Sequence, residues 1–314
     1  MNLLSISTIL IALTGGSALA ADHAPWKGDA SPSPAPPPSW SGFYAGLNAG
    51  GGVSTSTIVP TSGYSVFDWA AGVYNLPFGW TSGYRTANAS VGQAGVIGGG
   101  QIGYNFLIGP SWLVGFETDF QGTGLSGSGS STGLAGGSGN TTHAAENFLH
   151  LQSGIVSVSS GLDWIGTVRG RLGLLATPSV LIFATGGLAY GNTNGAVNTS
   201  GYHWHPGHED AHPENPVTPT WSSFDTASAG WTVGGGAEWM FWPGWSAKIE
   251  ALYYDLGSRS VNGQLSPLIN PAAPNSVAII NAADTTFNYQ GVIARAGVNY
   301  HFNWGAPSAF LAKD

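Results

Sequence analysis

Charge is scarce in this chain: Asp, Glu, Lys and Arg make up 8% of its 314 residues, against about a quarter in an ordinary soluble domain. Cysteine is absent, which excludes a disulfide framework, a thiolate metal site and the lipidated cysteine of a lipoprotein. Beyond the N-terminal segment, no stretch offers the roughly eighteen uninterrupted apolar residues of a transmembrane helix. Glycine, at 49 positions, and aromatic residues, at 12%, are abundant instead. This composition is typical of a protein whose outer surface faces something other than water.

The N-terminal segment, residues 1–20, resembles an export signal. It carries no side-chain charge, runs apolar from Leu3 to about Leu13, and ends on the small-x-small motif Ala18-Leu19-Ala20, which predicts cleavage before Ala21. A retained anchor is the alternative, but the apolar run is too short to span a bilayer. Residues 21–39 are rich in proline and are expected to form an extended periplasmic linker.

From Trp40 onward, small or apolar residues alternate with polar ones in eight stretches, each near the ten or so residues that a tilted transmembrane strand requires. A bilayer cannot satisfy the backbone of an open sheet, so only a closed barrel could span it. We therefore predict an all-β fold, an eight-stranded antiparallel up-and-down transmembrane β-barrel over residues 40–304, with a tail at 305–314. The expected strands are Gly42–Val53, Val96–Phe106, Trp112–Thr123, Trp164–Leu175, Val180–Gly191, Trp231–Phe241, Trp245–Leu256 and Tyr289–Phe302.

The connections between these stretches alternate in length. Three are tight and contain proline, at residues 107–111, 176–179 and 242–245, where proline and glycine suit turns. The other four are long and rich in Gly, Ser, Thr and Asn. Short periplasmic turns and long extracellular loops are the pattern of outer-membrane barrels, and both ends of the barrel would then lie on the periplasmic side.

A period of two divides each strand into two faces, and every charge in the middle of a strand falls opposite the apolar face. The second and fifth strands are too rich in glycine or too apolar to divide in this way. Arginine against hydrocarbon would cost about 2–4 kcal/mol at the bilayer midplane, so the charged face is predicted to point inward. A soluble sandwich with a half-polar sheet is the alternative. The expected lumen charge network consists of Glu117, Asp119, Arg169, Arg171, Glu238, Lys248, Glu250 and Arg295, whose signs balance as a buried cluster requires.

Three segments resemble a known family in their order and spacing: Trp40-Ser-Gly-Phe-Tyr-Ala-Gly46, Asp163-Trp-Ile-Gly-Thr-Val-Arg-Gly-Arg-Leu-Gly173 and Ala294-Arg-Ala-Gly-Val-Asn-Tyr-His-Phe302. They are similar to the alphaproteobacterial outer-membrane immunogenic proteins, a branch of the small OmpA-like barrels that carries a porin label. The resemblance covers roughly residues 40–304, although the long loops match nothing specific. It implies an outer-membrane location.

The resemblance also implies an assembly signal. In the family, the terminal aromatic residues of the last strand are read by the barrel-assembly machinery, so Tyr300 and Phe302 would carry that signal here. This chain continues past Phe302 to Asp314, so the signal does not lie at the extreme C-terminus, which leaves the details of assembly open. The expected partners are outer-membrane lipid and lipopolysaccharide, the barrel-assembly machinery, and a host or surface ligand that the sequence does not name.

An eight-stranded barrel is only wide enough for side chains to fill it, so we expect a filled lumen and a structural or surface-interaction role. A porin-like channel for small solutes is one alternative. Another is metal or haem binding by the third long loop, although a solvated polar loop explains the same residues. The candidate ligands are His203, His205, His208 and His212.

Catalysis is not expected, because the histidines lie in the linker, in loops or at a periplasmic strand end, and no nucleophile accompanies them. No cofactor is expected either. The net charge of −8 resides mainly in loops and tails, because the lumen charges cancel. The acidic residues outside the lumen, among them Glu146, Asp225 and Asp284, disfavour nucleic acid as a partner.

Overall fold

The structure is a computed structural model, and it describes residues 40–68, 79–82, 86–140, 147–204, 215–262 and 279–302. The predicted export signal and linker, and residues 303–314, lie outside the described part of the chain. Within that part, no helix is long and apolar enough to cross a membrane.

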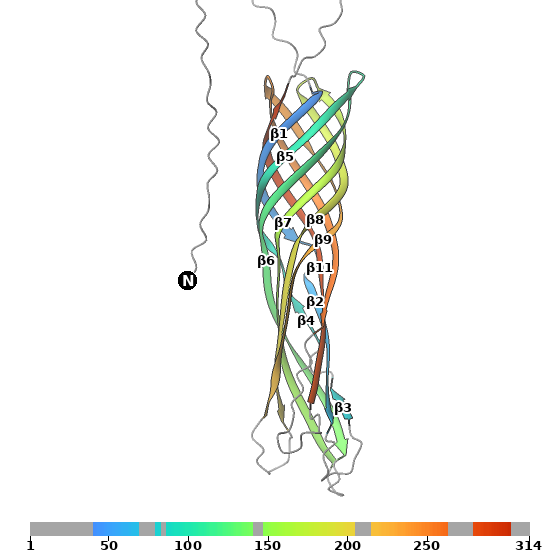
Figure 1. The fold of residues 1–314 in the computed structure, drawn as a ribbon, viewed down its shortest axis with the longest axis vertical. Helices are drawn as coiled ribbons and strands as arrows, with labels where there is room; N and C mark the ends of the chain where they lie inside the picture. The colour runs from blue at the N-terminus through green and yellow to red at the C-terminus, as the bar shows by residue number, and fades with distance from the viewer. Residues whose placement is uncertain are drawn as a thin grey trace, which may run out of the picture. The chain divides into compact units, whose positions relative to one another are not determined.

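Eight strands close into a barrel, as predicted from the sequence (Figure 1). Each neighbouring pair is antiparallel, and the first strand pairs with the last over residues 44–54 and 291–301, which closes the ring at that level. In ring order the strands are β1 (Gly42–Ser54), β5 (Ala94–Ile108), β6 (Trp112–Asn140), β7 (Asn147–Thr177), β8 (Val180–Trp204), β9 (Asn215–Trp242), β10 (Trp245–Asn262) and β11 (Ile279–His301).

The three tight connections are turns at the same end of the barrel. They join β5 to β6, β7 to β8 and β9 to β10. Gly109 and Gly244 adopt φ values of 63° and 77° there, a left-handed conformation that side chains disfavour. The predicted short turns on one side of the barrel are therefore confirmed.

The long connections differ from the expected loops, because most of their described residues continue the strands. β6 runs to Asn140 and β7 begins at Asn147, so these strands have 29 and 31 residues. We use the term extension for the part of the barrel that lies farther from the tight turns than Gly122 on β6 and Trp164 on β7. It includes the segments of the neighbouring strands at the same level. The physical reason is that buried apolar residues, such as Val156 and Val158, continue to alternate with serine there. Because these segments are rich in serine and glycine, the sequence analysis assigned them to loops.

The first long connection contains three short strands, β2 (Ile58–Asp68), β3 (Gly79–Ser82) and β4 (Ala87–Ser90). β2 pairs with β11 beyond the end of β1 and thus takes the place of β1 in the extension. β4 pairs with β2, and the chain after it lies against β6. A Cβ atom at Gly127 or Gly129 would come within 2.2 or 2.0 Å of the carbonyl oxygens of Gly92 and Ser90, so glycine permits this close approach.

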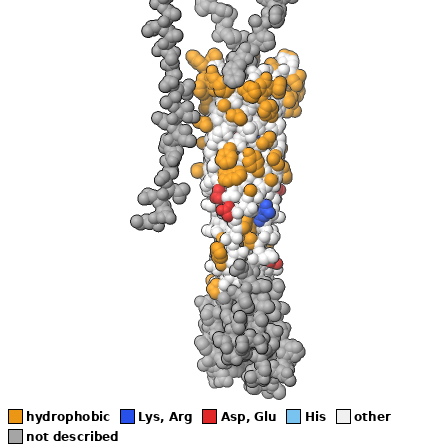
Figure 2. All heavy atoms as spheres, in the orientation of Figure 1, with side chains coloured by type: hydrophobic (Ala, Val, Ile, Leu, Met, Phe, Trp, Pro, Cys, Tyr) orange, Lys and Arg blue, Asp and Glu red, His pale blue; other side chains and the backbone are white. Residues whose placement is uncertain are grey.

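An apolar belt surrounds the barrel between the tight turns and the extension (Figure 2). Two girdles of exposed or half-buried aromatic residues mark its limits, and along single strands their members lie eight positions apart. Such pairs are Trp112 and Phe120, Trp239 and Trp231, and Trp245 and Tyr253. At about 3.3 Å per residue and a tilt of about 40° the girdles lie roughly 20 Å apart, comparable with the apolar band of outer-membrane barrels.

Candidate functional site

All eight predicted lumen charges lie inside the barrel, each at most 5% exposed. They come from five strands: Glu117 and Asp119 from β6, Arg169 and Arg171 from β7, Glu238 from β9, Lys248 and Glu250 from β10, and Arg295 from β11. They share the inner face because they occupy alternating positions on strands whose other face carries the apolar belt. The structure brings all of them into contact with a charge of opposite sign.

Glu117 and Lys248 connect opposite walls of the barrel. β6 and β10 are four strands apart in a ring of eight, so a contact between them crosses the full diameter. The Lys248 ammonium lies 2.9 Å from the Glu117 carboxylate and also donates to Gln101 Oε1 at 2.8 Å. Arg169 donates to the same carboxylate from β7. The Glu117 carboxylate therefore contacts cationic side chains from two different strands, β7 and β10.

Asp119 and Glu250 form ion pairs with Arg169 and Arg295. Arg169 Nη1 donates to Glu250 at 2.7 Å, and Arg169 Nη2 donates to Asp119 at 2.9 Å. Arg295 Nη2 lies 2.7 Å from carboxylate oxygens of both Asp119 and Glu250. Charge-assisted and multidentate contacts of this kind are the strong class of protein hydrogen bonds.

Arg171 and Glu238 form a second pair nearer the tight turns. The Arg171 guanidinium lies 3.9 Å from the ring centre of Phe183, a cation–π arrangement. Glu238 accepts hydrogen bonds from Ser246 at 2.5 Å and Asn299 at 2.7 Å. The buried carboxylate is thus satisfied by neutral donors as well as by its ion pair.

Neutral lumen residues that the sequence analysis did not single out hold the charges in place. Tyr44 donates to Glu117 at 2.7 Å, Thr167 donates to Asp119 at 2.8 Å, and Gln101 donates to Asn299 at 2.5 Å. Tyr44 lies on β1 and Gln101 on β5. The signal that could have found Gln101 is its place on the inner face of β5, but that strand has too many glycines to divide by periodicity.

Apolar clusters lie on both sides of the charges. Near the tight turns, Trp40, Leu113, Leu181, Phe183 and Met240 form one buried cluster. Trp40 precedes β1, yet its indole donates to the carbonyl of Pro178 in the β7–β8 turn at 2.9 Å. Because β1 and β7 are three strands apart in the ring, Trp40 reaches across that mouth of the barrel.

The second apolar cluster begins beyond the charges and continues into the extension. Its members come from both the belt and the extension, and all are at most 8% exposed. They are Val59, Ala87, Ala89, Val91, Ile97, Leu125, Val156, Val158, Leu162, Ile165, Ala189, Val197, Leu252, Tyr254, Leu256, Phe287, Tyr289 and Ile293. The interior of the barrel is therefore layered: apolar, ionic, apolar.

The predicted assembly residues lie at the end of β11 near the tight turns. Tyr300 is 40% exposed on the outer face, and its ring centre lies 5.1 Å from that of Trp245 and 5.0 Å from that of Phe302. These contacts place both aromatics in the girdle at this end. The recognition of Tyr300 and Phe302 during assembly stays a prediction.

The histidine-rich segment falls mostly outside the described residues, as His205, His208 and His212 do. His203 belongs to β8, where its backbone pairs with that of Asn215. Among the described residues, no group of three or more His, Cys, Asp or Glu side chains could hold a metal ion. Metal or haem binding by the four histidines stays a prediction.

Comparison with known proteins agrees with this geometry. The chain matches the outer membrane protein beta-barrel domain over residues 8–302. It belongs to this family of outer-membrane β-barrels. It is also 33% identical over 269 residues to the 31 kDa outer-membrane immunogenic proteins of Brucella melitensis biotype 1 and Brucella suis biovar 1, covering 84% of this chain and 84% of each relative. The predicted family and the outer-membrane location are thus confirmed.

Solved outer-membrane proteins resemble this barrel more distantly. The outer membrane protein OprG of Pseudomonas aeruginosa is 11% identical, with a TM-score of 0.36 over 83% of this chain and 97% of that one. The attachment invasion locus protein Ail of Yersinia pestis is 9% identical, with a TM-score of 0.24 over 81% of this chain and 99% of that one.

Proposed function

We propose that this outer-membrane barrel is a surface and envelope protein whose lumen is closed to solutes, and that it is neither a porin nor an enzyme. The observation that carries the proposal is the contact between Lys248 and Glu117, 2.9 Å long, between walls four strands apart. A channel through the centre would have to separate these two charges. Separating them would break a buried, hydrogen-bonded ion pair, which is energetically costly.

The layers on either side of the ions support the same proposal. Trp40, 2% exposed, reaches across the mouth near the tight turns, and beyond the ions the second cluster buries apolar side chains inside the barrel, among buried threonine and serine residues. A solute would have to pass two apolar layers and one layer of paired charges. In such a molecule the strands, rather than the lumen, present the surface that meets other molecules.

Conductance in planar bilayers tests the proposal. We expect the folded, full-length protein to give no uniform current steps. The Trp40→Ala variant should also give none, because the Lys248–Glu117 and Arg169 contacts remain. Insertion is checked on the same sample by heat-modifiable migration on a gel. Sustained steps of uniform size from the wild-type protein would refute the closed lumen and favour the porin alternative.

Assembly through Tyr300 and Phe302 is part of the proposal and has its own test. Replacing both by alanine should leave protein in the periplasm, because the assembly machinery would no longer read the end of β11. Trp245→Ala, which removes an aromatic neighbour in the same girdle, is the matched control and should still reach the outer membrane. Equal outer-membrane levels of all three proteins would refute this role.

A further inference from the structure

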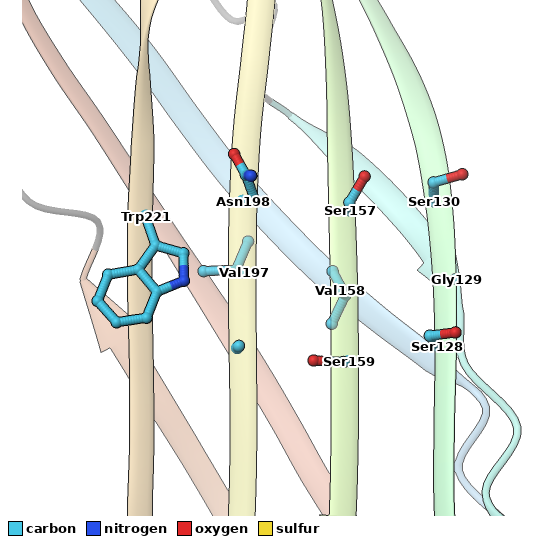
Figure 3. Close-up of a pocket in the computed structure, with 10 residues that line it drawn as sticks. Ser128, Gly129, Ser130, Ser157, Val158, Ser159, Val197, Asn198 and Trp221 are labelled. Atoms are coloured by element: carbon cyan, nitrogen blue, oxygen red, sulfur yellow. The ribbon is translucent and has the colours of Figure 1, made fainter. Parts of the chain in front are cut away.

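The outer face of the extension on β6, β7, β8 and β9 differs from the rest of the barrel surface. It forms a shallow trough floored by small side chains and bordered by Trp221, an indole that is 64% exposed (Figure 3). The lining residues that point outward are Ser128, Ser130, Ser157, Ser159, Ala196, Asn198 and Trp221. Tryptophan has an apolar body and one polar N–H group, and it is enriched at interfaces.

The strand register aligns these side chains in a row. Ser130 pairs with Ser157, Ser157 with Asn198, and Asn198 with Trp221. Neighbouring strands lie about 4.8 Å apart, so the row spans roughly 14 Å. It offers hydroxyl and amide groups, which both donate and accept hydrogen bonds, and it ends on an indole. In Figure 3 that indole lies at the β9 edge of the labelled residues.

Charge is confined to one end of this face. Asp163 and Asp225 lie at the level next to the second aromatic girdle, where the amide of Asn192 donates to both carboxylates. Farther from the belt, the described outward side chains of these four strands include no Asp, Glu, Lys or Arg. A charged ligand would find no partner on that part of the face, whereas an uncharged ligand rich in hydroxyl groups would.

The position of the trough identifies the source of such a ligand. Trp221 lies ten positions beyond Trp231 of the second girdle on β9, which is about 33 Å along the strand. The trough lies beyond Asp163 and Asp225, farther from the belt than these two carboxylates. In the outer leaflet the lipid is lipopolysaccharide, whose phosphates lie near the membrane interface and whose sugar chains extend outward from it.

We propose that this trough binds uncharged sugar units in the polysaccharide chains of the lipopolysaccharide that surrounds the protein. The indole of Trp221 would stack on the apolar face of a sugar ring. Asn198, Ser157 and Ser130 would hydrogen-bond to hydroxyl groups along the chain. The proposal does not depend on the closed lumen, because the trough lies on the outside of the barrel wall.

Binding of lipid-free polysaccharide tests the proposal. The probe is released by mild acid from lipopolysaccharide of the bacterium that carries this gene, and is titrated calorimetrically into the full-length protein in nanodiscs. We expect Trp221→Ala to weaken binding at least tenfold and Asn198→Ala to weaken it severalfold. Trp242→Ala is the matched control, because Trp242 is 68% exposed but lies at the β9–β10 turn. It should bind as the wild type does, and high salt should not reduce binding.

Three outcomes would overturn the proposal. The wild-type protein does not bind the polysaccharide, or Trp221→Ala binds it as tightly as the wild type, or binding disappears at high salt and is therefore electrostatic. Sedimentation of the same samples provides a further check. If Trp221→Ala converts a dimer into a monomer, a second copy of this chain covers the trough and the sugar assignment is wrong.

Discussion

The belt and the extension are built from the same strands but distribute their side chains in opposite ways. On β7 within the belt, Val168 is 50% exposed on the outer face and Arg169 is 1% exposed inside. Farther along the same strand, Ser157 lies outside, whereas Val158 is 3% exposed inside. A strand that alternates every second residue therefore changes from apolar-out to apolar-in as it leaves the membrane.

The difference between the two regions shows that the outer medium determines which face is apolar. Within the membrane the outer face must be apolar, because exposure of charge to hydrocarbon is costly, and the sheltered interior can hold balanced ions. Outside the membrane the outer face meets water, so burial of apolar side chains inside the extension is the main stabilising contribution. The two interiors should therefore respond differently to mutation.

Removing one lumen charge should have the largest effect. Arg169→Ala removes a cation that contacts Glu117, Asp119 and Glu250, so we expect the free energy of unfolding to fall by about 3–5 kcal/mol. Urea unfolding in lipid vesicles, followed by tryptophan fluorescence, measures it. Arg259→Ala in the extension is the control. Arg259 contacts only uncharged groups at 3.3–3.4 Å among its described hydrogen bonds, so the expected loss is under about 1 kcal/mol. Equal losses of unfolding free energy in Arg169→Ala and Arg259→Ala would contradict the proposed difference between the belt and the extension.

Truncating an apolar residue should matter more inside the extension than on the lipid side of the belt. Leu162 is 1% exposed in the second cluster, and Leu162→Ala should leave a cavity and cost about 2–5 kcal/mol. Leu172 is 52% exposed in the belt, where lipid chains can close around the shorter side chain, so Leu172→Ala should cost less. The same urea titration measures both variants. A larger loss from Leu172→Ala would show that the extension contributes little to stability.

Adding a positive charge to the outer face should lower the free energy of unfolding more in the belt than in the extension. Val168→Arg places a cation against hydrocarbon and should cost about 2–4 kcal/mol. Ser157→Arg places the same side chain on the same face of the same strand but outside the belt, where surface substitutions change stability by about 0.5 kcal/mol or less. Comparable losses of unfolding free energy would mean that the membrane does not end near the second girdle.

The closed eight-stranded barrel and its lumen charges could be predicted because both follow from a period of two. Glu117 on β6 and Lys248 on β10 could each be assigned to the inner face from the alternation in their own strands. Each buried charge was expected to have a partner of opposite sign. Their contact across the diameter could not be predicted, because it depends on the order and register of all eight strands. The sequence analysis identified Trp40 only as part of a motif. Its hydrogen bond to Pro178 could not be predicted, because the two residues are far apart in the sequence.

The extension was missed for a different physical reason. Register shifts interrupt three strands near the second girdle, between Gly122 and Leu125, Leu162 and Trp164, and Asp255 and Ser258. On β7 the shift moves the outward face from even to odd positions, from Trp164 and Val168 to Asp163 and Ser157. A bulge of this kind breaks the period of two, so the strand seems to end where it only changes parity.

Gly257 tests that boundary through a smaller expected effect than those of the lumen and belt variants. It lies within the β10 irregularity with a φ of 81°, and its amide donates to Asp255 at 2.8 Å. Because a Cβ atom there would meet nothing within 4 Å, Gly257→Ala should cost only the left-handed backbone strain, roughly 1–2 kcal/mol. Gly92→Ala is the matched control, since its Cβ would also meet nothing within 4 Å and its φ is not positive. Urea unfolding should separate the two variants by that amount; equal stabilities would mean that β10 crosses the boundary without a left-handed residue.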